Sequence, residues 1–429
     1  MKYQETVDYL FTRLPMYSRI GAAAYKADLD NTIELCRSLG DPHTKFRSVH
    51  IAGTNGKGSV SHLLASILQE AGYKTGLYTS PHLWDFRERI KINGIKIPEE
   101  YVITFTEGIQ SQIERIEPSF FEITVAMAFN WFASEEVDIA VIETGLGGRL
   151  DSTNIIIPEL SVITNIGMDH MDLLGDTIDK IAGEKAGIIK DHVPVVIGEK
   201  DDRTREVFED RAWEKNAPLV FADDRRKALN WYWLKNELIV EIAKEQETDH
   251  RIYRLDLPGI YQVKNLVTVL ESVDQLKQAG WEIPESAILE GIRNAKKSTG
   301  LHGRWEIIHQ SPLIVLDVAH NAEGIKQLRE QVEVTDHHDL HIVLGFVKDK
   351  KIEDALALLP KHAHYYFTQA QIPRALPAAE LKGKAISYEL NGGDYPDVND
   401  ALRAARDKAK PQDLIIVCGS IFVVAEARI

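Results

Sequence analysis

Short apolar stretches alternate with helical patterns along almost the whole chain, and this alternation limits the possible folds more than any other feature. The apolar stretch at residues 46–52 is followed by apolar residues at helical spacing over 59–71 and by a second stretch at 74–79. The stretches 138–144 and 160–166 continue the series. Parallel strands need a crossover connection, which is usually a helix. The sequence therefore predicts an α/β fold built on parallel sheets.

The length of 429 residues predicts two domains, because single hydrophobic cores stop growing beyond about 250–300 residues. The chain loosens at KKSTGLHGR, and the alternation then restarts. We expect an N-terminal P-loop ATPase-like domain over 1–297 and a smaller Rossmann-like domain over 298–429, both doubly wound. Segments 230–242 and 251–257 alternate differently and predict a small antiparallel sheet beside the first domain.

Composition and charge exclude several classes of protein. The net charge of −15 argues against binding nucleic acid or anionic lipid through the overall field. No apolar run reaches the ~18 residues of a membrane span, and the N-terminus lacks the apolar core of a signal peptide. Cys36 and Cys418 have no metal or redox spacing and are interpreted as apolar fillers. We expect a cytoplasmic monomer with neither nucleic acid nor membrane as a partner.

A glycine-rich stretch, GTNGKGS at 53–59, lies between the first strand and its helix. A phosphate-binding loop requires that context, although the spacing here is shorter than G-x-x-x-x-G-K-[ST]. The glycines allow backbone amides to approach phosphate oxygens, and the helix N-terminus adds partial positive charge. Lys57 supplies a mobile cation for the outer phosphates. The alternative is a tight strand-to-helix turn with an exposed lysine.

Polar side chains also follow two other predicted strands. Glu143 ends one strand, and Asp169 and His170 follow the next. The carboxyl ends of parallel strands face the crevice where such folds bind ligands. A carboxylate there suits Mg²⁺, which takes few protein ligands and keeps waters. The alternatives are an ion pair between Glu143 and Arg149, and a purely structural histidine.

Lys185 lies in a small, apolar helical stretch, IAGEKAGI. Composition alone favours a lysine whose amine reaches solvent. Burial would instead lower the pKa and make the neutral amine reactive. A neutral lysine can add carbon dioxide and become a carbamate, which is an anionic metal ligand.

The predicted second domain carries a similar pattern. DVAHN at 317–321 ends a strand and starts a helix, and Gly419-Ser420 forms a further turn at a strand end. Both are crevice positions. The alternative is that Asp317 or Asn321 is a plain helix cap.

Together these motifs resemble the folylpolyglutamate synthase and dihydrofolate synthase family, a branch of the Mur-ligase-like ATP-dependent amide ligases. The resemblance covers nearly the whole chain and rests on GTNGKGS, YTSPHL, RERIKING, ETGLGGRLDSTN, the Asp-His pair, GEKAGI, GRWE, DVAHN and GSIF, in this order. The short phosphate loop is itself a mark of this superfamily. Two departures occur: the family's His-Gln-x-x-Asn begins with Tyr261, and its DxAHNP ends in Ala322. Neither departure changes a proposed metal ligand.

The resemblance implies a reaction and its cofactors. ATP activates the carboxylate of a folate or dihydropteroate as an acyl phosphate, and L-glutamate is joined to it. Two Mg²⁺ ions and a carbamate formed on Lys185 from CO₂ are implied as well. The sequence does not decide whether the enzyme acts on dihydropteroate, on reduced folates or on both, and we expect both.

The resemblance also implies roles for individual residues. The implied catalytic residues are Lys57, His170, Lys185 and His320. The implied ATP-binding residues are Asn55, Gly56, Lys57, Gly58, Ser59, Asn265, Arg304 and Asp317. The implied metal ligands are Ser80, Glu143, His170 and Lys185. The implied folate-binding residues are His82, Arg87, Phe121, Glu122 and Asp151, and the implied glutamate-binding residues are His320 and Ser420.

The sequence argues against two other functions. A related ligase that adds an amino acid to a cell-wall precursor commonly has an extra N-terminal domain, for which we expect no room before the loop at residue 53. That branch also places a hydroxyl directly after the lysine, where this chain has Gly58. A regulatory nucleotide-binding protein would not need Lys185, Asp317 and His320 in addition to the loop.

Overall fold

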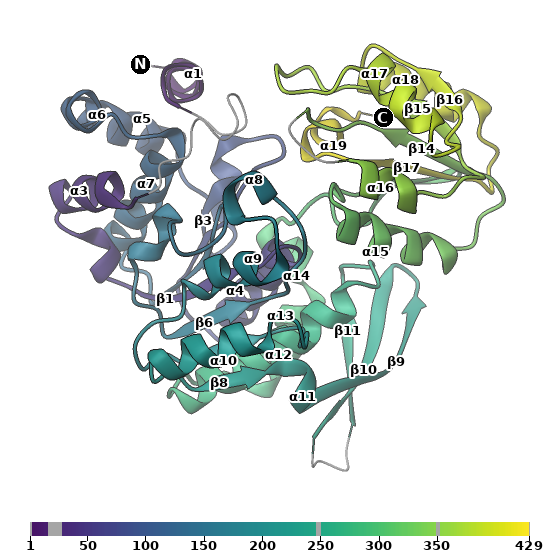
Figure 1. Cartoon of the computed structure of the whole chain (residues 1–429). Helices are drawn as coiled ribbons and strands as arrows, with labels where there is room; N and C mark the ends of the chain where they lie inside the picture. Colours follow the sequence, from purple (N-terminus) through teal and green to yellow (C-terminus); the bar gives the residue numbers. More distant parts are fainter. Residues whose placement is uncertain (1, 16–27, 246–249, 349–351, 429) are drawn as a thin grey trace. The chain divides into compact units, whose positions relative to one another are not determined.

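The computed structural model describes residues 2–15, 28–245, 250–348 and 352–428. The chain divides into two compact units (Figure 1). The first unit comprises Met1–Asp256 and Gln262–Leu301, and the second comprises Leu257–Tyr261 and His302–Ile429. The chain thus visits the second unit briefly before α12 begins at Gln262, an excursion that the sequence patterns did not predict.

Eight strands form the main sheet of the first unit, in the order β4-β3-β2-β5-β1-β6-β7-β8. Their bounds are β1 (Arg47–Ala52), β2 (Thr75–Tyr78), β3 (Ile90–Ile92), β4 (Ile95–Lys96), β5 (Ile139–Glu143), β6 (Leu160–Ile163), β7 (Val195–Ile197) and β8 (Leu219–Phe221). From β2 to β8 neighbouring strands are parallel, whereas β3 and β4 form an antiparallel edge. The predicted α/β architecture of this unit is confirmed.

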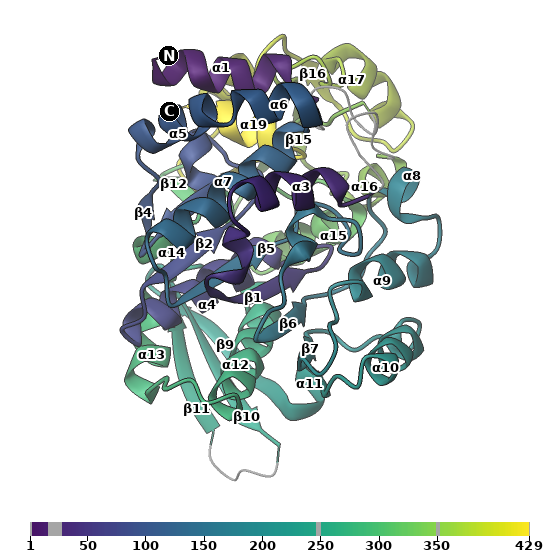
Figure 2. The same ribbon diagram turned by 90° about the vertical axis from the view of Figure 1, so that its left-hand side faces the viewer.

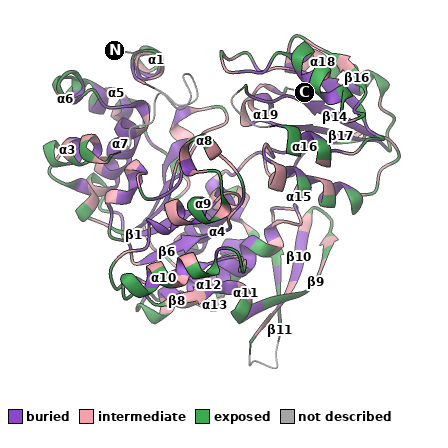
Figure 3. Cartoon of the chain, in the orientation of Figure 1, coloured by how far each residue is buried: buried purple, intermediate pink, exposed green. Residues whose placement is uncertain are grey.

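Helices bury both faces of this sheet (Figure 3). One core packs α7 against the sheet through Phe129 and Ile142, and another packs α9 and α10 through Ile163 and Phe208. The helices of the first unit are α1 (Tyr3–Arg13), α3 (Asp30–Ser38), α4 (Lys57–Glu70), α5 (Glu99–Gly108), α6 (Gln110–Ile116), α7 (Phe120–Ser134), α8 (Met171–Leu174), α9 (Ile178–Ala186), α10 (Arg205–Glu214), α11 (Ala222–Arg225), α12 (Gln262–Gln278), α13 (Glu285–Arg293) and α14 (Ala295–Thr299). Within the described ranges, no helix is both long and apolar enough to cross a bilayer.

A separate antiparallel sheet lies against α12 and α13 (Figures 1 and 2). Its strands are β9 (Arg226–Leu234), β10 (Glu237–Lys244) and β11 (His250–Leu255), in the order β11-β10-β9. The predicted side sheet is confirmed, and the segment 230–242 contributes to two of its strands. A tight turn at Lys235, with φ of 59°, separates them. Residue alternation continues across such a turn, so periodicity alone does not reveal it.

The second unit has a six-stranded sheet in the order β12-β13-β17-β14-β15-β16. Only β12 is antiparallel to its neighbour, so the predicted smaller Rossmann-like domain is confirmed. The strands are β12 (Glu306–Gln310), β13 (Leu313–Leu316), β14 (Leu340–Leu344), β15 (His364–Phe367), β16 (Gly392–Asp394) and β17 (Leu414–Cys418). The helices are α15 (Ala322–Glu333), α16 (Glu353–Leu358), α17 (Ala378–Ile386), α18 (Val398–Lys408) and α19 (Ile421–Glu426).

Candidate active site

The first unit gathers its predicted site residues at one edge of the main sheet. Strands β2, β5, β1 and β6 are neighbours and run parallel, so their carboxyl ends lie side by side. Ser80, Glu143, the 53–59 loop and the segment leading to His170 follow these four ends. Four sequence-distant motifs therefore meet at one crevice, as parallel-sheet folds require of a ligand site.

The 53–59 loop adopts a conformation that only glycine tolerates at two positions. Gly53 has φ of 151°, and a Cβ there would lie 1.9 Å from Thr164 Oγ1. Gly56 has φ of 82°, and a Cβ there would lie 2.4 Å from Asn265 Oδ1. Helix α4 begins directly after Gly56, so its N-terminal amides open onto the loop. This is the arrangement that binds phosphate at a helix N-terminus.

Four polar side chains fix the loop in place, and three of them, Thr164, Asn165 and Gln262, had no predicted role. Thr164 Oγ1 donates to the carbonyl of Asn55 at 2.6 Å, and the amide of Asn55 donates to Asn165 Oδ1 at 2.9 Å. Gln262 Nε2 donates to Ser59 Oγ at 3.1 Å, and Asn265 Nδ2 donates to Gln262 Oε1 at 2.8 Å. The sequence signal that could have identified Thr164 and Asn165 is their position as a polar pair directly after an apolar strand.

Gly56→Ala tests this loop geometry. The substitution combines an unfavourable positive φ with a contact against Asn265, so we expect the free energy of unfolding to fall by about 1–3 kcal/mol. ADP affinity should fall with it, because α12 must shift away from the loop. Chemical denaturation and calorimetric ADP titration measure both effects. Gly72→Ala is the matched control, because Gly72 has φ of 93° but nothing within 4 Å of the added Cβ. Equal ADP affinity in both variants would contradict the proposed contact.

Two lysines converge on one carbonyl of the loop. Lys57 Nζ and Lys185 Nζ each donate to the carbonyl of Gly53 at 3.0 Å. Lys57 also donates to the carbonyl of Thr54 at 3.2 Å, which leaves one of its three N–H donors for a phosphate oxygen. The alternative interpretation, a strand-to-helix turn with an exposed lysine, is therefore wrong for Lys57.

Lys185 is buried, with only 4% of its surface exposed. The prediction from composition, that the Lys185 amine reaches solvent, is therefore wrong, because α9 packs the residue against the phosphate loop. Burial, and secondarily the positive charge of Lys57, lowers the pKa of Lys185 to about 7. Close to neutral pH a large share of this amine is uncharged, and an uncharged lysine amine is nucleophilic.

Glu143 lies buried at the end of β5, where its Oε2 accepts a hydrogen bond from the amide of Ser80 at 3.2 Å. Two predicted metal ligands from adjacent strands are thus brought together. Arg149, the alternative partner of Glu143, forms an ion pair with Glu184 at 2.8 Å. His170 follows β6 in a left-handed conformation, with φ of 50°, directly before α8. Its Nε2 lies 3.8 Å from Asp169 Oδ2.

Phe121 and Asp151 border the ETGLGGRLD loop. A Cβ on Gly145 would lie 2.4 Å from Phe121 Cζ, so the ring packs directly on this loop. Asp151 is buried and accepts hydrogen bonds from the amide of Leu146 and from the amide and hydroxyl of Thr153. His50 Nε2 lies 2.9 Å from the same hydroxyl. Since Thr153 gives its proton to Asp151, His50 must donate from Nε2.

The other predicted folate-binding residues have internal partners. His82 Nδ1 accepts from Arg89 Nε at 2.8 Å, and burial together with Arg89 lowers the pKa of His82 to about 3. His82 is therefore neutral and carries its proton on Nε2. Arg87 forms an ion pair with Asp85 at 2.9 Å. Glu122 accepts from the amide of Ser119 at 2.6 Å and completes the capping box of α7, a structural task that was not predicted.

The second unit places Asp317 at the end of β13, buried and surrounded by donors. Its carboxylate accepts from the hydroxyl of Tyr261 at 2.8 Å and from the amides of Trp305 and Ala319, both at 2.9 Å. Burial raises the pKa of Asp317. Tyr261, the departure from the family pattern, is thus a hydrogen-bond donor to a predicted ATP-binding residue. Asp317 is not a plain helix cap, whereas Asn321 does cap α15.

Tyr261→Phe should lower the free energy of unfolding by about 1–2 kcal/mol, because it removes one donor from a buried carboxylate. The pKa of Asp317 should rise further, since the ionised form loses a hydrogen bond. Thermal unfolding followed from pH 3, below the ordinary pKa of a carboxyl group, up to pH 8 detects both changes. Tyr388→Phe serves as a control in the same unit. A Tyr261→Phe variant as stable as the parent at every pH would contradict this account.

The remaining predicted residues of the second unit lie near its strand ends. Ser420 follows β17 and caps α19 by accepting from the amide of Phe422 at 3.2 Å. His320 Nδ1 lies 2.8 Å from the carbonyl of Val318, so the proton is on Nδ1. Arg304 donates to the carbonyl of His302 at 3.1 Å. These contacts orient the side chains, and their roles toward ATP and glutamate stay predictions.

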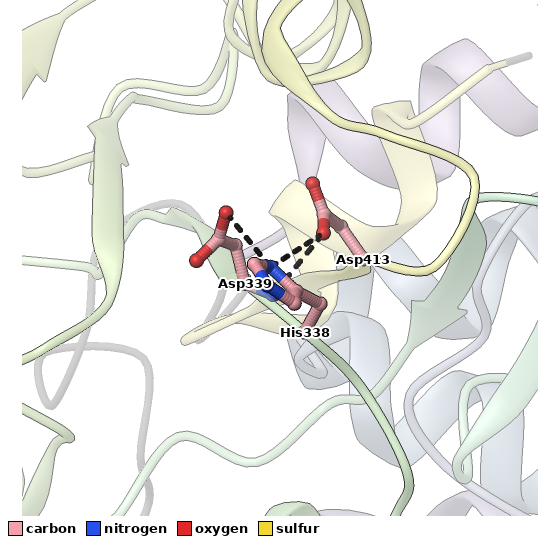
Figure 4. A group of neighbouring side chains, drawn as sticks. All are labelled: His338, Asp339 and Asp413. Atoms are coloured by element: carbon pink, nitrogen blue, oxygen red, sulfur yellow. Dashed lines mark hydrogen bonds and ion pairs between the residues drawn. The ribbon is translucent and has the colours of Figure 1, made fainter.

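A separate group of potential metal ligands, His338, Asp339 and Asp413, lies at the opposite, amino ends of β14 and β17 (Figure 4). Asp413 accepts from the amides of Asp339 at 3.1 Å and Lys410 at 2.7 Å. His338 is largely exposed. The group is explained by these turn-closing hydrogen bonds, and none of its members belongs to the predicted site.

Two family models, several curated proteins and several solved structures are similar to this chain. The Mur ligase middle domain matches residues 51–273, and the Mur ligase glutamate ligase domain matches residues 303–421. The dihydrofolate synthase/folylpolyglutamate synthase of Bacillus subtilis is 33% identical over 99% of this chain and 98% of its own length. The folylpolyglutamate synthase of Lacticaseibacillus casei is 31% identical over 100% and 98%. The structure of Escherichia coli FolC in complex with DHPP and ADP aligns with a TM-score of 0.84 and 30% identity, over 99% and 96%.

The fold and site therefore define an enzyme of the Mur ligase class of ATP-dependent ligases. Within that class, the chain belongs to the dihydrofolate synthase/folylpolyglutamate synthase family.

Proposed function

We propose that the chain joins L-glutamate to the carboxylate of a folate or dihydropteroate at the expense of ATP. The observation that carries this proposal is the pair of lysines on the Gly53 carbonyl, beside the Glu143–Ser80 contact, at the carboxyl edge of the sheet. A phosphate loop alone binds a nucleotide. The second lysine and the buried carboxylate add the charges that phosphoryl transfer needs. The names of the relatives supply the substrate class.

The chemistry of the substrates explains why ATP is required. A carboxylate is a poor electrophile because oxide is a very poor leaving group. When the acceptor carboxylate attacks the γ-phosphorus of ATP, ADP leaves and an acyl phosphate forms. The amine of glutamate then attacks the acyl carbon and loses a proton, and phosphate leaves with the electrons of the broken C–O bond. The loop amides, the α4 N-terminus and Lys57 hold the phosphates in line for the first step.

The residues present fit magnesium by the chemistry of their donors. The Glu143 carboxylate and the Ser80 hydroxyl offer the hard oxygen atoms that Mg²⁺ takes, and His170 offers a nitrogen. When bound, Mg²⁺ neutralises charge on the transferring phosphoryl group. We propose Glu143, Ser80 and His170 as holders of one ion.

We further propose that Lys185 is carbamylated and helps hold a second magnesium ion. Support comes from the burial of the amine and its lowered pKa, since only the uncharged amine adds CO₂. Carbamylation also exchanges an ammonium group for an anion next to Lys57, so a repulsion becomes an attraction. The family resemblance points to the same residue.

The substrates are assigned to the two units as follows. Phe121 and Asp151, on or beside the ETGLGGRLD loop, and His82, with its fixed Nε2–H donor, are proposed to bind the pterin part of the acceptor. Arg87 and Glu122 are proposed to support that site. In the second unit, His320 and Ser420 are proposed to bind glutamate, and Arg304 and Asp317, together with Asn265 of the first unit, to contact the nucleotide. The match of residues 303–421 to a glutamate ligase domain supports this division.

The choice of acceptor is tested directly by assay. The purified chain receives ATP, Mg²⁺ and glutamate with either dihydropteroate or a tetrahydrofolate, and ADP formation is measured. We propose activity with both, as in the two-activity name of the Bacillus subtilis relative. Activity with the tetrahydrofolate alone would match the single-activity name of the Lacticaseibacillus casei relative and would overturn the bifunctional part of the proposal.

A further inference from the structure

A pocket of about 200 Å³ lies within the first unit, between the side sheet and helices α12 and α13. Its lining residues are Arg226, Ile242, Lys244, Arg251, Tyr253, Leu270, Asp274, Lys277, Glu285 and Ile288. None of them belongs to the candidate active site. Since a water in the liquid occupies about 30 Å³, this volume suits roughly six waters or one small polar molecule.

The charge of the pocket is opposite to that of the chain. Four cationic side chains line it, but only two carboxylates do, in a chain of net charge −15. Even when Glu271, which lies 3.6 Å from Arg226, is counted as a third carboxylate, one positive charge remains in excess. Lys277 has no ion-pair partner among the residues that the structure describes. A local cationic site of this kind attracts anions despite the overall field.

Two cations in the pocket are held in an unfavourable arrangement. Arg226 of β9 and Lys244 of β10 are direct cross-strand partners, and like charges in that register destabilise a sheet. Asp274 of α12 bridges them: its Oδ2 lies 2.9 Å from Lys244 Nζ and also pairs with Arg226. Arg226 is only 8% exposed, and its Nε lies 3.6 Å from Glu271 Oε2, too far for a hydrogen bond, so both buried atoms lack a hydrogen-bond partner. A buried donor without a hydrogen bond is costly, so the contacts of Arg226 in this arrangement are incompletely satisfied.

Both helical walls of the pocket contact elements of the ATP site: α12 contacts the phosphate loop, and α13 contacts the helix that follows the loop. Asp274 and Asn265 lie nine residues apart on α12, about 13 Å along its axis, and Asn265 packs against Gly56 of the loop. Helix α13 packs on α4, the helix that the loop begins: a Cβ on Gly291 would lie 2.6 Å from the Cα of Ile67. A ligand that draws Arg226 and Lys244 away from Asp274 would therefore act on two elements that position the ATP site.

We propose that this pocket binds a small anion with two or more negative charges on carboxylate or phosphate oxygens, and that its occupancy is coupled to nucleotide binding through α12 and α13. Arg251 and Lys277 form the accessible side of the site, and Arg226 and Lys244 form its buried side. The ligand neutralises the excess positive charge of the pocket.

Calorimetric titration of the full chain tests the site. Inorganic phosphate and citrate are the two probes, and ADP with Mg²⁺ is kept saturating so that the phosphate loop is filled. We expect one site per chain for at least one probe, and the probe that binds tells phosphate from carboxylate ligands. The double variant Arg251→Gln/Lys277→Gln should weaken binding at least tenfold, because it removes two cations but leaves the buried Arg226–Asp274 pair intact. Lys227→Gln, an exposed cation next to Arg226 on β9, should change the affinity less than twofold.

Absence of saturable binding of either probe would overturn the proposal. Equal affinity of the probe for the parent chain and the double variant would also overturn it, because the measured heat would then come from binding at the active site. Coupling is tested by measuring ADP affinity with and without the probe. A change of at least threefold in the parent chain and none in the double variant is expected, since linkage is reciprocal. Binding without any change in ADP affinity would overturn the coupling. These readouts need no turnover, so they stand or fall independently of the ligase activity.

Discussion

Lys185→Ala should lower the rate of glutamate-dependent ADP formation by at least about a hundredfold, the usual effect of removing a charged group that stabilises a transition state. The side chain is buried and donates to the same carbonyl as Lys57, so the substitution removes a group directly at the phosphate loop. Steady-state kinetics at saturating ATP measure the effect. Short carboxylic acids such as acetate should partly restore the rate, because their carboxylate replaces that of the carbamate.

Two controls separate chemistry from folding. Lys190 is another lysine whose pKa burial lowers, to about 8, but its Nζ donates to the carbonyl of Asn154, away from the loop. Lys190→Ala should therefore retain most activity and should not respond to acetate. Lys185→Met should keep or raise the Tm, because it removes a buried charge next to Lys57. If the Lys185→Ala variant has the rate of the parent chain, the proposed carbamate on Lys185 is wrong.

The lowered pKa of Lys185 also sets a pH dependence. With a pKa of about 7, the uncharged fraction is roughly 10% at pH 6 and 90% at pH 8. Activation by added bicarbonate should therefore rise across this interval and level off above it. The folded chain binds fewer protons at this site than the unfolded chain between about pH 7 and 10.5, so the contribution of Lys185 to stability increases with pH there. Activation that falls from pH 6 to pH 8 would contradict the assignment.

Glu143→Gln is expected to have the second large effect. The amide keeps the size of the side chain and an oxygen that can accept from the Ser80 amide, but it removes the charge that would bind Mg²⁺. We expect the Mg²⁺ concentration for half-maximal activity to rise at least tenfold and the maximal rate to fall by about a hundredfold, with little change in Tm. A magnesium titration of the rate, together with thermal unfolding, measures both.

Glu184→Gln is the matched control for this substitution. Glu184 belongs to the same region of the first unit but pairs with Arg149 at a partly exposed position, so its loss should cost less than about 1 kcal/mol and leave the magnesium dependence unchanged. A Glu143→Gln variant with a strongly lowered Tm and normal magnesium dependence would favour a purely structural role for Glu143.

The sequence predicted the positions of Glu143 and the 53–59 loop because each lies at the end of a recognisable apolar strand, and parallel strands end at a common edge. Ser80 was implied only by the family resemblance. The burial of Lys185 could not be predicted in this way. Its neighbours Ala182 and Ala186 show that one helix face packs closely, but they do not show what packs on it. The Gly53 carbonyl that receives its amine lies 132 residues away in sequence.

Other features depend on contacts that no local pattern encodes. The Tyr261–Asp317 hydrogen bond needs the chain to enter the second unit between two elements of the first. Thr164 and Asn165 form a polar pair directly after an apolar strand, but their hydrogen bonds to the phosphate loop follow from the pairing of β6 with β1, which the local sequence does not encode. Glu122, in contrast, had a local signal: Ser119 three residues before it forms a capping-box pattern, which accounts for its position without any ligand.

The central claim is that this chain forms an amide between a folate-type carboxylate and glutamate at the expense of ATP. Mass spectrometry of the acceptor after incubation with ATP, Mg²⁺ and glutamate tests it most directly, with dihydropteroate, a tetrahydrofolate and a nucleotide-sugar peptide supplied in turn. The account predicts a gain of one glutamyl residue on a pterin-bearing acceptor, one ADP per residue added, and no product on the peptide. Extension of the peptide, or ADP release without glutamate on any pterin acceptor, would contradict it.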